Sequence, residues 1–194
     1  MKAIHQIIQV ALITVLMLGA STFATAQSKS DYKQEVKELK SQLEEIVKAN
    51  EIIAQNLKTF DELDFEVFTN EEWTRLHESH TEDILVHWPD GHTTKGIKKH
   101  IEDLSAMFVY APDTRIEEHP LRIASGNLTA VLGVIEGTFT EPMPIGEGNT
   151  IPPTGKAYKL NMVTIGLWNE DGQMYEEYLF WDNLAFMQQL GLAQ

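Results

Sequence analysis

Apolar side chains recur three and four residues apart over a long stretch near the start of the chain. This spacing predicts one apolar face of a long α-helix. Further apolar residues beside it, such as Val47 and Ala54, broaden that face, which favours docking onto a domain over a free two-stranded coiled coil. The segment from Asp31 to Ala49 is the alternative candidate for pairing with another subunit. The face consists of Val36, Leu39, Leu43, Ile46, Asn50, Ile53, Leu57 and Phe60.

Two shorter helices are expected after the long one. Thr69-Asn-Glu-Glu72 has the form of a capping box, with Thr69 at the N-cap and Glu72 at N3. It predicts a short helix that carries Trp73, Leu76, His77 and His80 on one face. Thr94 is expected to cap the next helix, which Pro112 ends. The apolar face of that helix consists of Ile97, Ile101, Leu104 and Phe108.

Alternating and β-branched runs predict a sheet in the rest of the chain. A Pro-Asp-Gly turn stops the run Ile84–Trp88, and Asn169-Glu-Asp-Gly172 is typical of a hairpin turn. The Pro- and Gly-rich stretch 142–155 is expected to be a loop able to cover a cavity, and a last helix, Asn183–Leu190, ends before Gly191. Helices followed by antiparallel strands indicate an α+β fold, with helices covering one face of a curved sheet around a cone-shaped hollow. The other expected strands are Arg115–Ala124, Leu128–Phe139, Tyr158–Trp168 and Met174–Trp181.

Composition excludes several classes of function. The chain of 194 residues has a formal net charge of −14, and a strongly acidic surface repels phosphate backbones, so no nucleic-acid partner is expected. The absence of cysteine excludes disulfides, thiolate nucleophiles and cysteine-ligated zinc. The length suits one domain with a full core plus additional sequence.

The N-terminal segment has the features of a signal peptide. Lys2 supplies a short basic region, Ile7–Leu18 is mostly apolar, and Ala24-Thr-Ala26 is a cleavage site that would leave Gln27 as the first residue. An uncleaved anchor helix is the alternative, but the apolar run is shorter than the ~20 residues of a bilayer span. We therefore expect a periplasmic or secreted protein without a membrane segment after cleavage.

Sequence motifs for cofactors are absent. His87-Trp-Pro-Asp90-Gly-His92 contains metal-binding residue types, but its spacing matches no defined metal signature, so no metal is expected. His77, His80 and His100 are expected to be structural. Without a G-x-S-x-G motif, a phosphate loop or a nucleotide fingerprint, the expected chemistry is cofactor-free proton transfer by Asp, Glu or His.

Asp182 has two possible roles. It follows an aromatic run and precedes the last helix, where aspartate is a favoured N-cap. Alternatively, desolvation beside Trp181 and Tyr178 would raise its pKa and make it an acid/base group at an apolar pocket. Strand alternation places Glu177 on the same face as Trp181, and Tyr178 on the opposite face.

Three stretches of the chain resemble a known family. They are Glu82-Asp-Ile-Leu-Val-His87 with the following turn, Pro152-Pro-Thr-Gly155, and the ending from Asp171-Gly-Gln-Met-Tyr-Glu-Glu-Tyr through Trp181-Asp-Asn183 to Met187-Gln-Gln-Leu-Gly191. Over residues 52–191 the chain thus resembles the SnoaL-like polyketide cyclases, or ester cyclases, of the NTF2-like superfamily. The resemblance implies a cone-shaped NTF2-like domain over residues 52–194, preceded by a signal peptide (1–26) and a helical extension (27–51).

The resemblance also implies an activity. In the family, an aspartate at the position of Asp182 is the acid/base residue of an intramolecular aldol cyclisation of a small carbonyl compound. His87 is a second catalytic candidate, and the resemblance implies no cofactor and a homo-oligomer. Where members often have Glu-His-Trp, this chain has Glu176-Glu177-Tyr178. A non-catalytic binding or structural module of the same fold is the alternative. The expected pocket residues are Trp88, His92, Glu177, Trp181 and Tyr178.

Overall fold

A computed structural model describes residues 29–194 of the chain. The predicted signal peptide and its cleavage site lie outside the described residues. The described residues fall into two units, divided between Ile46 and Val47. None of the helices in the described part combines the length and the apolar character needed to cross a membrane.

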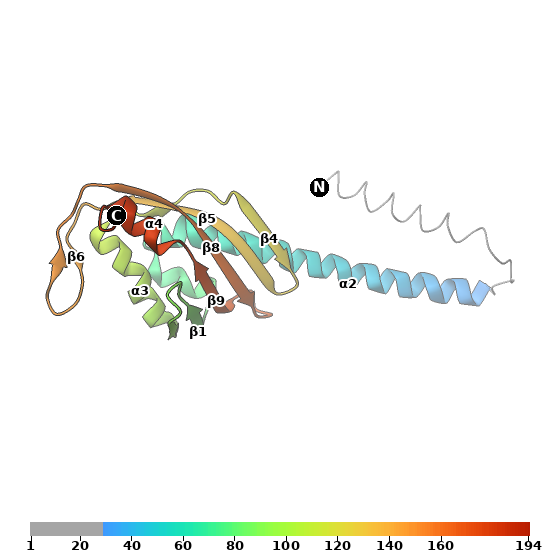
Figure 1. Cartoon of the computed structure of the whole chain (residues 1–194). Coiled ribbons are helices and arrows are strands. Elements are labelled where there is room, and N and C mark those ends of the chain that lie inside the picture. Colours follow the sequence, from blue (N-terminus) through green and yellow to red (C-terminus); the bar gives the residue numbers. More distant parts are fainter. Residues whose placement is uncertain (1–28) are drawn as a thin grey trace. The chain divides into compact units, whose positions relative to one another are not determined.

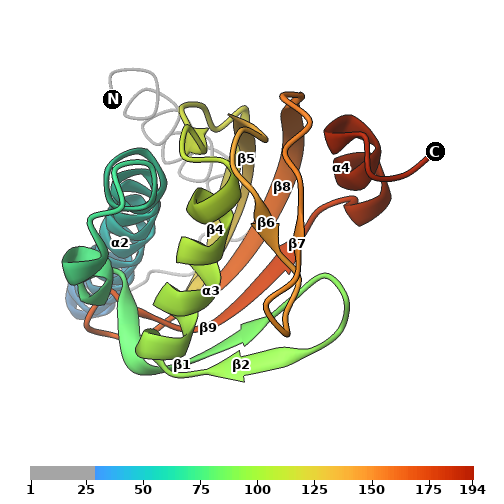
Figure 2. The ribbon, with the colours of Figure 1, turned by 90° about the vertical axis from the view of Figure 1, so that its left-hand side faces the viewer.

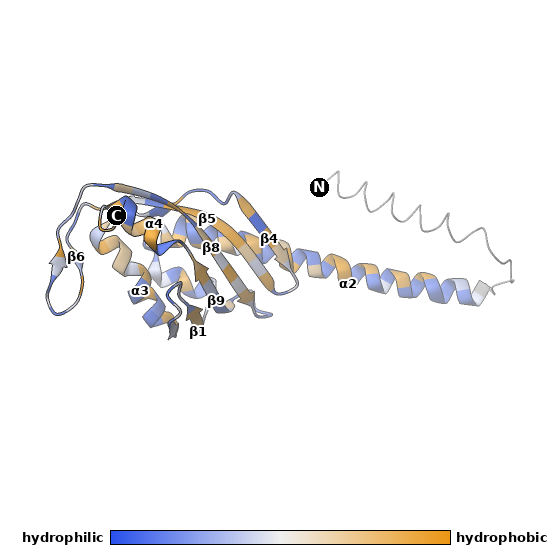
Figure 3. Ribbon diagram, viewed as in Figure 1, coloured by the Kyte–Doolittle hydropathy of each residue, from blue (hydrophilic) through white to orange (hydrophobic). Residues whose placement is uncertain are grey.

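The long predicted helix is present as α2, Lys29–Glu62 (Figure 1). Figure 3 shows hydrophobic and hydrophilic residues alternating along it. Its apolar side chains up to Ile52 are exposed, whereas Phe60 is buried and Leu57 is partly buried. The predicted docking face is therefore buried only near its C-terminal end. Pairing of the earlier part with another subunit stays a prediction.

The predicted capping box is wrong. The helical path continues beyond α2 as a π-helix, η1 (Leu63–Phe68). Thr69 is the C-cap of this π-helix and not the N-cap of the next helix. The Thr69 hydroxyl donates to the carbonyl oxygens of Asp64 and Ile116, so it is not available to cap a following helix. The next segment, η2 (Trp73–Glu78), is a short 3₁₀-helix without a side-chain cap.

One curved sheet forms the body of the second unit (Figure 1). Its strand order is β2-β1-β9-β8-β5-β3, and β4 also pairs with β5. All pairs are antiparallel except β1 with β9, which is parallel. The strands are β1 (His80–His87), β2 (Thr93–Lys95), β3 (Arg115–Ile116), β4 (Leu121–Ser125), β5 (Leu128–Thr138), β8 (Ala157–Trp168) and β9 (Met174–Phe180).

Helix α3 (Ile97–Tyr110) covers one face of this sheet, as Figure 2 shows. Its N-cap is Gly96, with φ of 93°, and not Thr94. Thr94 instead lies in β2, where its hydroxyl accepts a hydrogen bond from Trp88 Nε1 at 2.9 Å. The prediction for α3 was otherwise confirmed, since Ile97 and Phe108 are buried.

The predicted loop 142–155 contains a small two-stranded ribbon, β6 (Met143–Pro144) with β7 (Thr150–Ile151). Helix α4 (Asn183–Leu190) ends the fold and packs on β8. Its C-cap Gly191 adopts φ of 78°, as expected for the left-handed position that glycine favours. These elements form the predicted α+β, NTF2-like fold.

Candidate active site

A cavity of about 40 Å³ lies between η1, α3 and the sheet. Most of its lining is apolar, but Asp64, His80, His100 and Glu177 also border it. These four titratable residues and the fifth polar lining residue, Thr164, are all buried, and no lysine or arginine of the described residues lines the cavity. The apolar lining comprises Leu63, Phe68, Trp88, Leu104, Met107, Ile116, Ile135, Met162, Leu179 and Trp181.

Glu177 lies between two histidines at one end of the cavity. Its Oε2 atom is 3.2 Å from His100 Nε2 and 3.9 Å from His80 Nε2. The three residues come from different elements: His80 begins β1, His100 lies on α3, and Glu177 lies on β9. Burial alone would raise the pKa of Glu177, but the two imidazoles outweigh burial and lower that pKa below its ordinary value. Glu177 is therefore an ionised carboxylate inside the protein.

The ring of His80 is oriented by its neighbour in the chain. Ser79 Oγ donates to the carbonyl oxygen of Leu76 at 3.2 Å and lies 2.9 Å from His80 Nδ1. When the hydroxyl proton points to Leu76, the Ser79 oxygen accepts a hydrogen bond from His80 Nδ1–H. In that tautomer of a neutral imidazole the lone pair lies on Nε2, the atom that faces Glu177.

A second carboxyl group, Asp64, enters the cavity from η1. The wide turn of a π-helix is rare and is frequently found at functional sites. Asp64 Oδ2 lies 2.9 Å from His119 Nε2, and His119 Nδ1 lies 2.8 Å from Asp61 Oδ1. Arg122 contacts the other oxygen of Asp61. A chain of hydrogen bonds thus runs from the cavity through His119 to the protein surface.

The pKa values of Asp64 and His119 are both raised. For Asp64, burial is the main cause, and it outweighs the opposite effect of His119. For His119, burial lowers the pKa, but the flanking carboxylates of Asp64 and Asp61 together raise it above 6.5. The cavity therefore contains two carboxyl groups with opposite pKa shifts, Asp64 raised and Glu177 lowered. Such a pair is the arrangement that general acid–base catalysis uses.

Comparison with known proteins identifies the family. The sequence model of the SnoaL-like polyketide cyclase family matches residues 58–190. The chain belongs to the SnoaL-like polyketide cyclase family. Its residue range includes Asp64, His119 and Glu177, so the whole cavity lies within the SnoaL-like domain. No curated protein matches this chain.

Solved structures share the SnoaL-like fold. A proposed SnoaL-like polyketide cyclase from Jannaschia sp. CCS1 is 21% identical, with a TM-score of 0.63 over 74% of this chain and 96% of that chain. IdmH from Streptomyces antibioticus, a proposed polyketide cyclase, is 22% identical, with a TM-score of 0.59 over 71% of this chain and 99% of IdmH. A protein with a ketosteroid isomerase-like fold from Catenulispora acidiphila, solved with trimethylamine, is 12% identical, with a TM-score of 0.52 over 65% and 87%.

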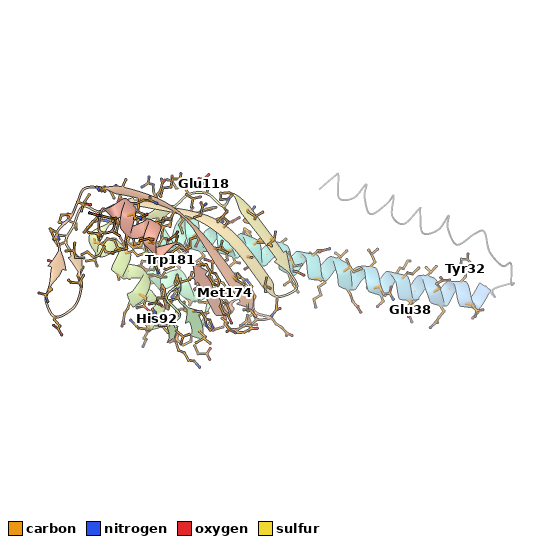
Figure 4. All side chains as sticks on the ribbon, viewed as in Figure 1. Tyr32, Glu38, His92, Glu118, Met174 and Trp181 are labelled. Atoms are coloured by element: carbon orange, nitrogen blue, oxygen red, sulfur yellow. The ribbon has the colours of Figure 1, made fainter. Side chains whose placement is uncertain are left out.

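Three of the predicted pocket residues of this SnoaL-like protein border the cavity. Glu177 and Trp181 do so from the same face of β9, as alternation predicted, together with Leu179. Trp88 lines the cavity beside Trp181, with the ring centroids 6.3 Å apart in an edge-to-face contact. Trp181, labelled in Figure 4, directly follows β9 and precedes Asp182, the N-cap of α4.

The other predicted site residues do not border the cavity. His87 Nε2 contacts Glu176 Oε1 at 2.9 Å, and its ring stacks on Tyr178 with the centroids 4.0 Å apart. Because these side chains alternate with the buried Val86 and Glu177, they lie on the opposite face of the sheet. His92, labelled in Figure 4, is exposed and pairs with Asp90 in the β1–β2 turn. His87, Asp90 and His92 therefore form no common metal site.

Asp182 caps helix α4, which is one of the two roles predicted for it. Its side chain is exposed and does not border the cavity. Its Oδ1 atom accepts a hydrogen bond from the backbone N–H of Ala185 at 2.9 Å, which makes it the N-cap of α4. The carboxyl groups that border the cavity in this structure are Asp64 and Glu177, and not Asp182.

Sequence reasoning missed Asp64, His80, His100 and His119. His80 and His100 were predicted to be structural, yet both border the cavity. His80 was also assigned to a helix face, but it begins β1 and points inward. One signal was available: Asp64 stands among apolar residues in Leu-Asp-Phe-Glu-Val-Phe, a setting in which a carboxyl group requires a partner.

Proposed function

We propose that this protein is an exported SnoaL-like enzyme that transfers a proton next to a carbonyl group and thereby isomerises or cyclises a small carbonyl compound. The observation that carries the proposal is Asp64, a buried carboxyl group with a raised pKa at the wall of an apolar cavity. A carboxylate with a raised pKa is a stronger base than one in water, and an apolar wall retains the substrate.

The reaction begins at Asp64. In its ionised form Asp64 removes a proton from the carbon beside the carbonyl; the C–H electron pair forms a C=C bond, and the C=O π pair moves onto the oxygen to give an enolate. Asp64 then returns the proton at another carbon, which completes an isomerisation. In a cyclisation, the enolate carbon attacks a second carbonyl group of the same molecule, and the new alkoxide takes the proton.

His119 positions the base. Its two ring nitrogens contact Asp64 and Asp61, so the Asp64 carboxyl is fixed in orientation. The imidazole also supplies positive charge beside Asp64 when the latter is ionised. The cavity is also lined by the imidazoles of His80 and His100, toward which the substrate oxygen would be directed, because a carboxylate such as Glu177 cannot donate a hydrogen bond to it.

The size of the cavity restricts the substrate. A volume of about 40 Å³ holds a few water molecules, since one water requires about 10–15 Å³. Trp88, Trp181 and Met107 are only partly buried, and methionine side chains adapt readily. Binding of a ring-sized carbonyl compound would require these three side chains to move apart.

A β,γ-unsaturated cyclohexenone provides a direct test, because migration of its double bond to the conjugated position increases ultraviolet absorbance. The wild-type protein is expected to accelerate this reaction and to exchange the migrating hydrogen with solvent deuterium. The Asp64→Asn variant removes the base while retaining a polar group for His119, and it is expected to lower the rate by about 100-fold or more.

The matched control is Asp182→Asn, the same chemical change at an exposed carboxylate. We expect this variant to retain the wild-type rate. Equal rates for Asp64→Asn and the wild type would refute Asp64 as the base. Binding of ketones of increasing size without any hydrogen exchange would instead support the alternative of a non-catalytic binding module.

A further inference from the structure

Beyond the proposed proton transfer, we propose that His80, His100 and Glu177 form a binding site for one first-row divalent metal ion such as Zn²⁺. One ligand atom from each residue lies within 4.8 Å of the other two, and all three side chains are buried. The site borders the cavity, so a coordination position remains open toward a bound molecule. This differs from the sequence-based expectation of no metal.

The ligand atoms have the spacing that a metal requires. Bonds of about 2.1 Å to a tetrahedral Zn²⁺ place ligand atoms about 3.4 Å apart. The Glu177 Oε2 atom lies 3.2 Å from His100 Nε2 and 3.9 Å from His80 Nε2. The three ligand atoms lie within 4.8 Å of one another, so His80 has to move toward the other two residues for all three atoms to bind one ion.

Two of these three ligand atoms lack a hydrogen bond. Among the described residues, His80 Nε2 and Glu177 Oε2 are buried without a hydrogen bond of normal geometry. When the Ser79 hydroxyl donates to Leu76, the ring proton of a neutral His80 lies on Nδ1, and the Nε2 lone pair is available to bind a cation. A cation between His80 Nε2 and Glu177 Oε2 would give both atoms the partner that they lack. A serine that fixes the outer nitrogen is also the kind of outer partner that metal-bound histidines have.

Charge balance supports the same conclusion. Glu177 is buried, and no lysine or arginine of the described residues lines the cavity. A buried carboxylate requires a positive partner. A divalent ion held by Glu177 and the two imidazoles would supply that charge.

The ligand set indicates the type of metal. Two imidazoles and one carboxylate suit Zn²⁺ or Fe²⁺, whereas Mg²⁺ and Ca²⁺ prefer oxygen ligands alone. The three ligands stand on β1, α3 and β9, regular elements that hold a site more firmly than loops do.

The test is a titration of the purified, chelator-treated protein with Zn²⁺ by calorimetry and with Co²⁺ by visible spectroscopy. We expect one ion per chain and a Co²⁺ spectrum typical of mixed nitrogen and oxygen ligands. The His100→Gln and Glu177→Gln variants each remove a ligand, so each should weaken binding by more than the roughly 10–100-fold caused by loss of an outer partner. Ser79→Ala removes such an outer partner and is expected to weaken binding by about 10-fold.

The matched control is His92→Gln, which removes an exposed histidine that also pairs with a carboxylate. It should leave Zn²⁺ binding unchanged. The proposal would be overturned if the wild type did not bind Zn²⁺ stoichiometrically. It would also be overturned if His92→Gln lost binding while Ser79→Ala and His100→Gln retained it. If a ligand variant does not fold, Ser79→Ala decides the outcome. Metal binding is measured without substrate, so its result is independent of the cyclohexenone assay. The protein can bind the metal without catalysing that reaction, and it can catalyse the reaction without binding the metal.

Discussion

Replacement of Asp182 separates its structural role from a catalytic one. In Asp182→Ala, the backbone N–H of Ala185 loses its acceptor at 2.9 Å. Asn183 cannot substitute, because its side-chain oxygen accepts a hydrogen bond from Trp181 Nε1 at 2.6 Å. Loss of an N-cap costs about 1 kcal/mol, within a range of about 0.5–2 kcal/mol. For a domain of this size, about 1 kcal/mol corresponds to a fall in Tm of about 2–4 °C.

The matched variant is Asp182→Asn, because asparagine caps helices about as well as aspartate. It loses only the favourable charge at the start of α4, about 0.3–1 kcal/mol. Thermal unfolding followed by circular dichroism measures both variants, and the cyclohexenone assay measures their activity. We expect a lower Tm for the alanine variant, a smaller change for the asparagine variant, and full activity in both. An asparagine variant with wild-type stability and no activity would show that Asp182 is the acid/base group after all.

Two further predictions concern pH and processing. The pKa values of His119 and Asp64 are raised on folding, so their contribution to stability is present at low pH and is lost as the pH rises through those values. We expect the urea midpoint of unfolding to fall as the pH rises above about 6.5, the ordinary histidine pKa, and we expect this fall to be smaller in His119→Gln. A wild-type midpoint that does not change with pH would contradict this prediction. Mass spectrometry of the full chain produced in a bacterial host is expected to show a protein beginning at Gln27, and an intact Lys2 would show that the segment is retained.

Local patterns in the sequence predicted most of the regular elements. Strands β5 and β8 follow the alternation over Leu128–Phe139 and Tyr158–Trp168 within one residue at each end. Alternation also placed Glu177 and Trp181 on a common face, which is the face that borders the cavity. These predictions succeeded because side-chain period and strand geometry are properties of neighbouring residues.

The polar part of the site depends on contacts between distant residues. Asp64 and His119 are 55 positions apart in the chain, and His100 and Glu177 come from a helix and a strand. No local pattern indicates that these groups meet. The π-helix was missed for a related reason, because its extra residue per turn is stabilised by tertiary contacts such as those of Thr69 with Ile116.

The two indole rings at the cavity give the protein an intrinsic optical reporter. Trp88 and Trp181 are partly exposed and contact each other edge to face beside the apolar lining. An organic molecule that enters the cavity replaces water against these rings, and indole emission shifts to shorter wavelength in a drier environment. Libraries of carbonyl compounds can therefore be screened by fluorescence with the unlabelled protein, before any substrate is known.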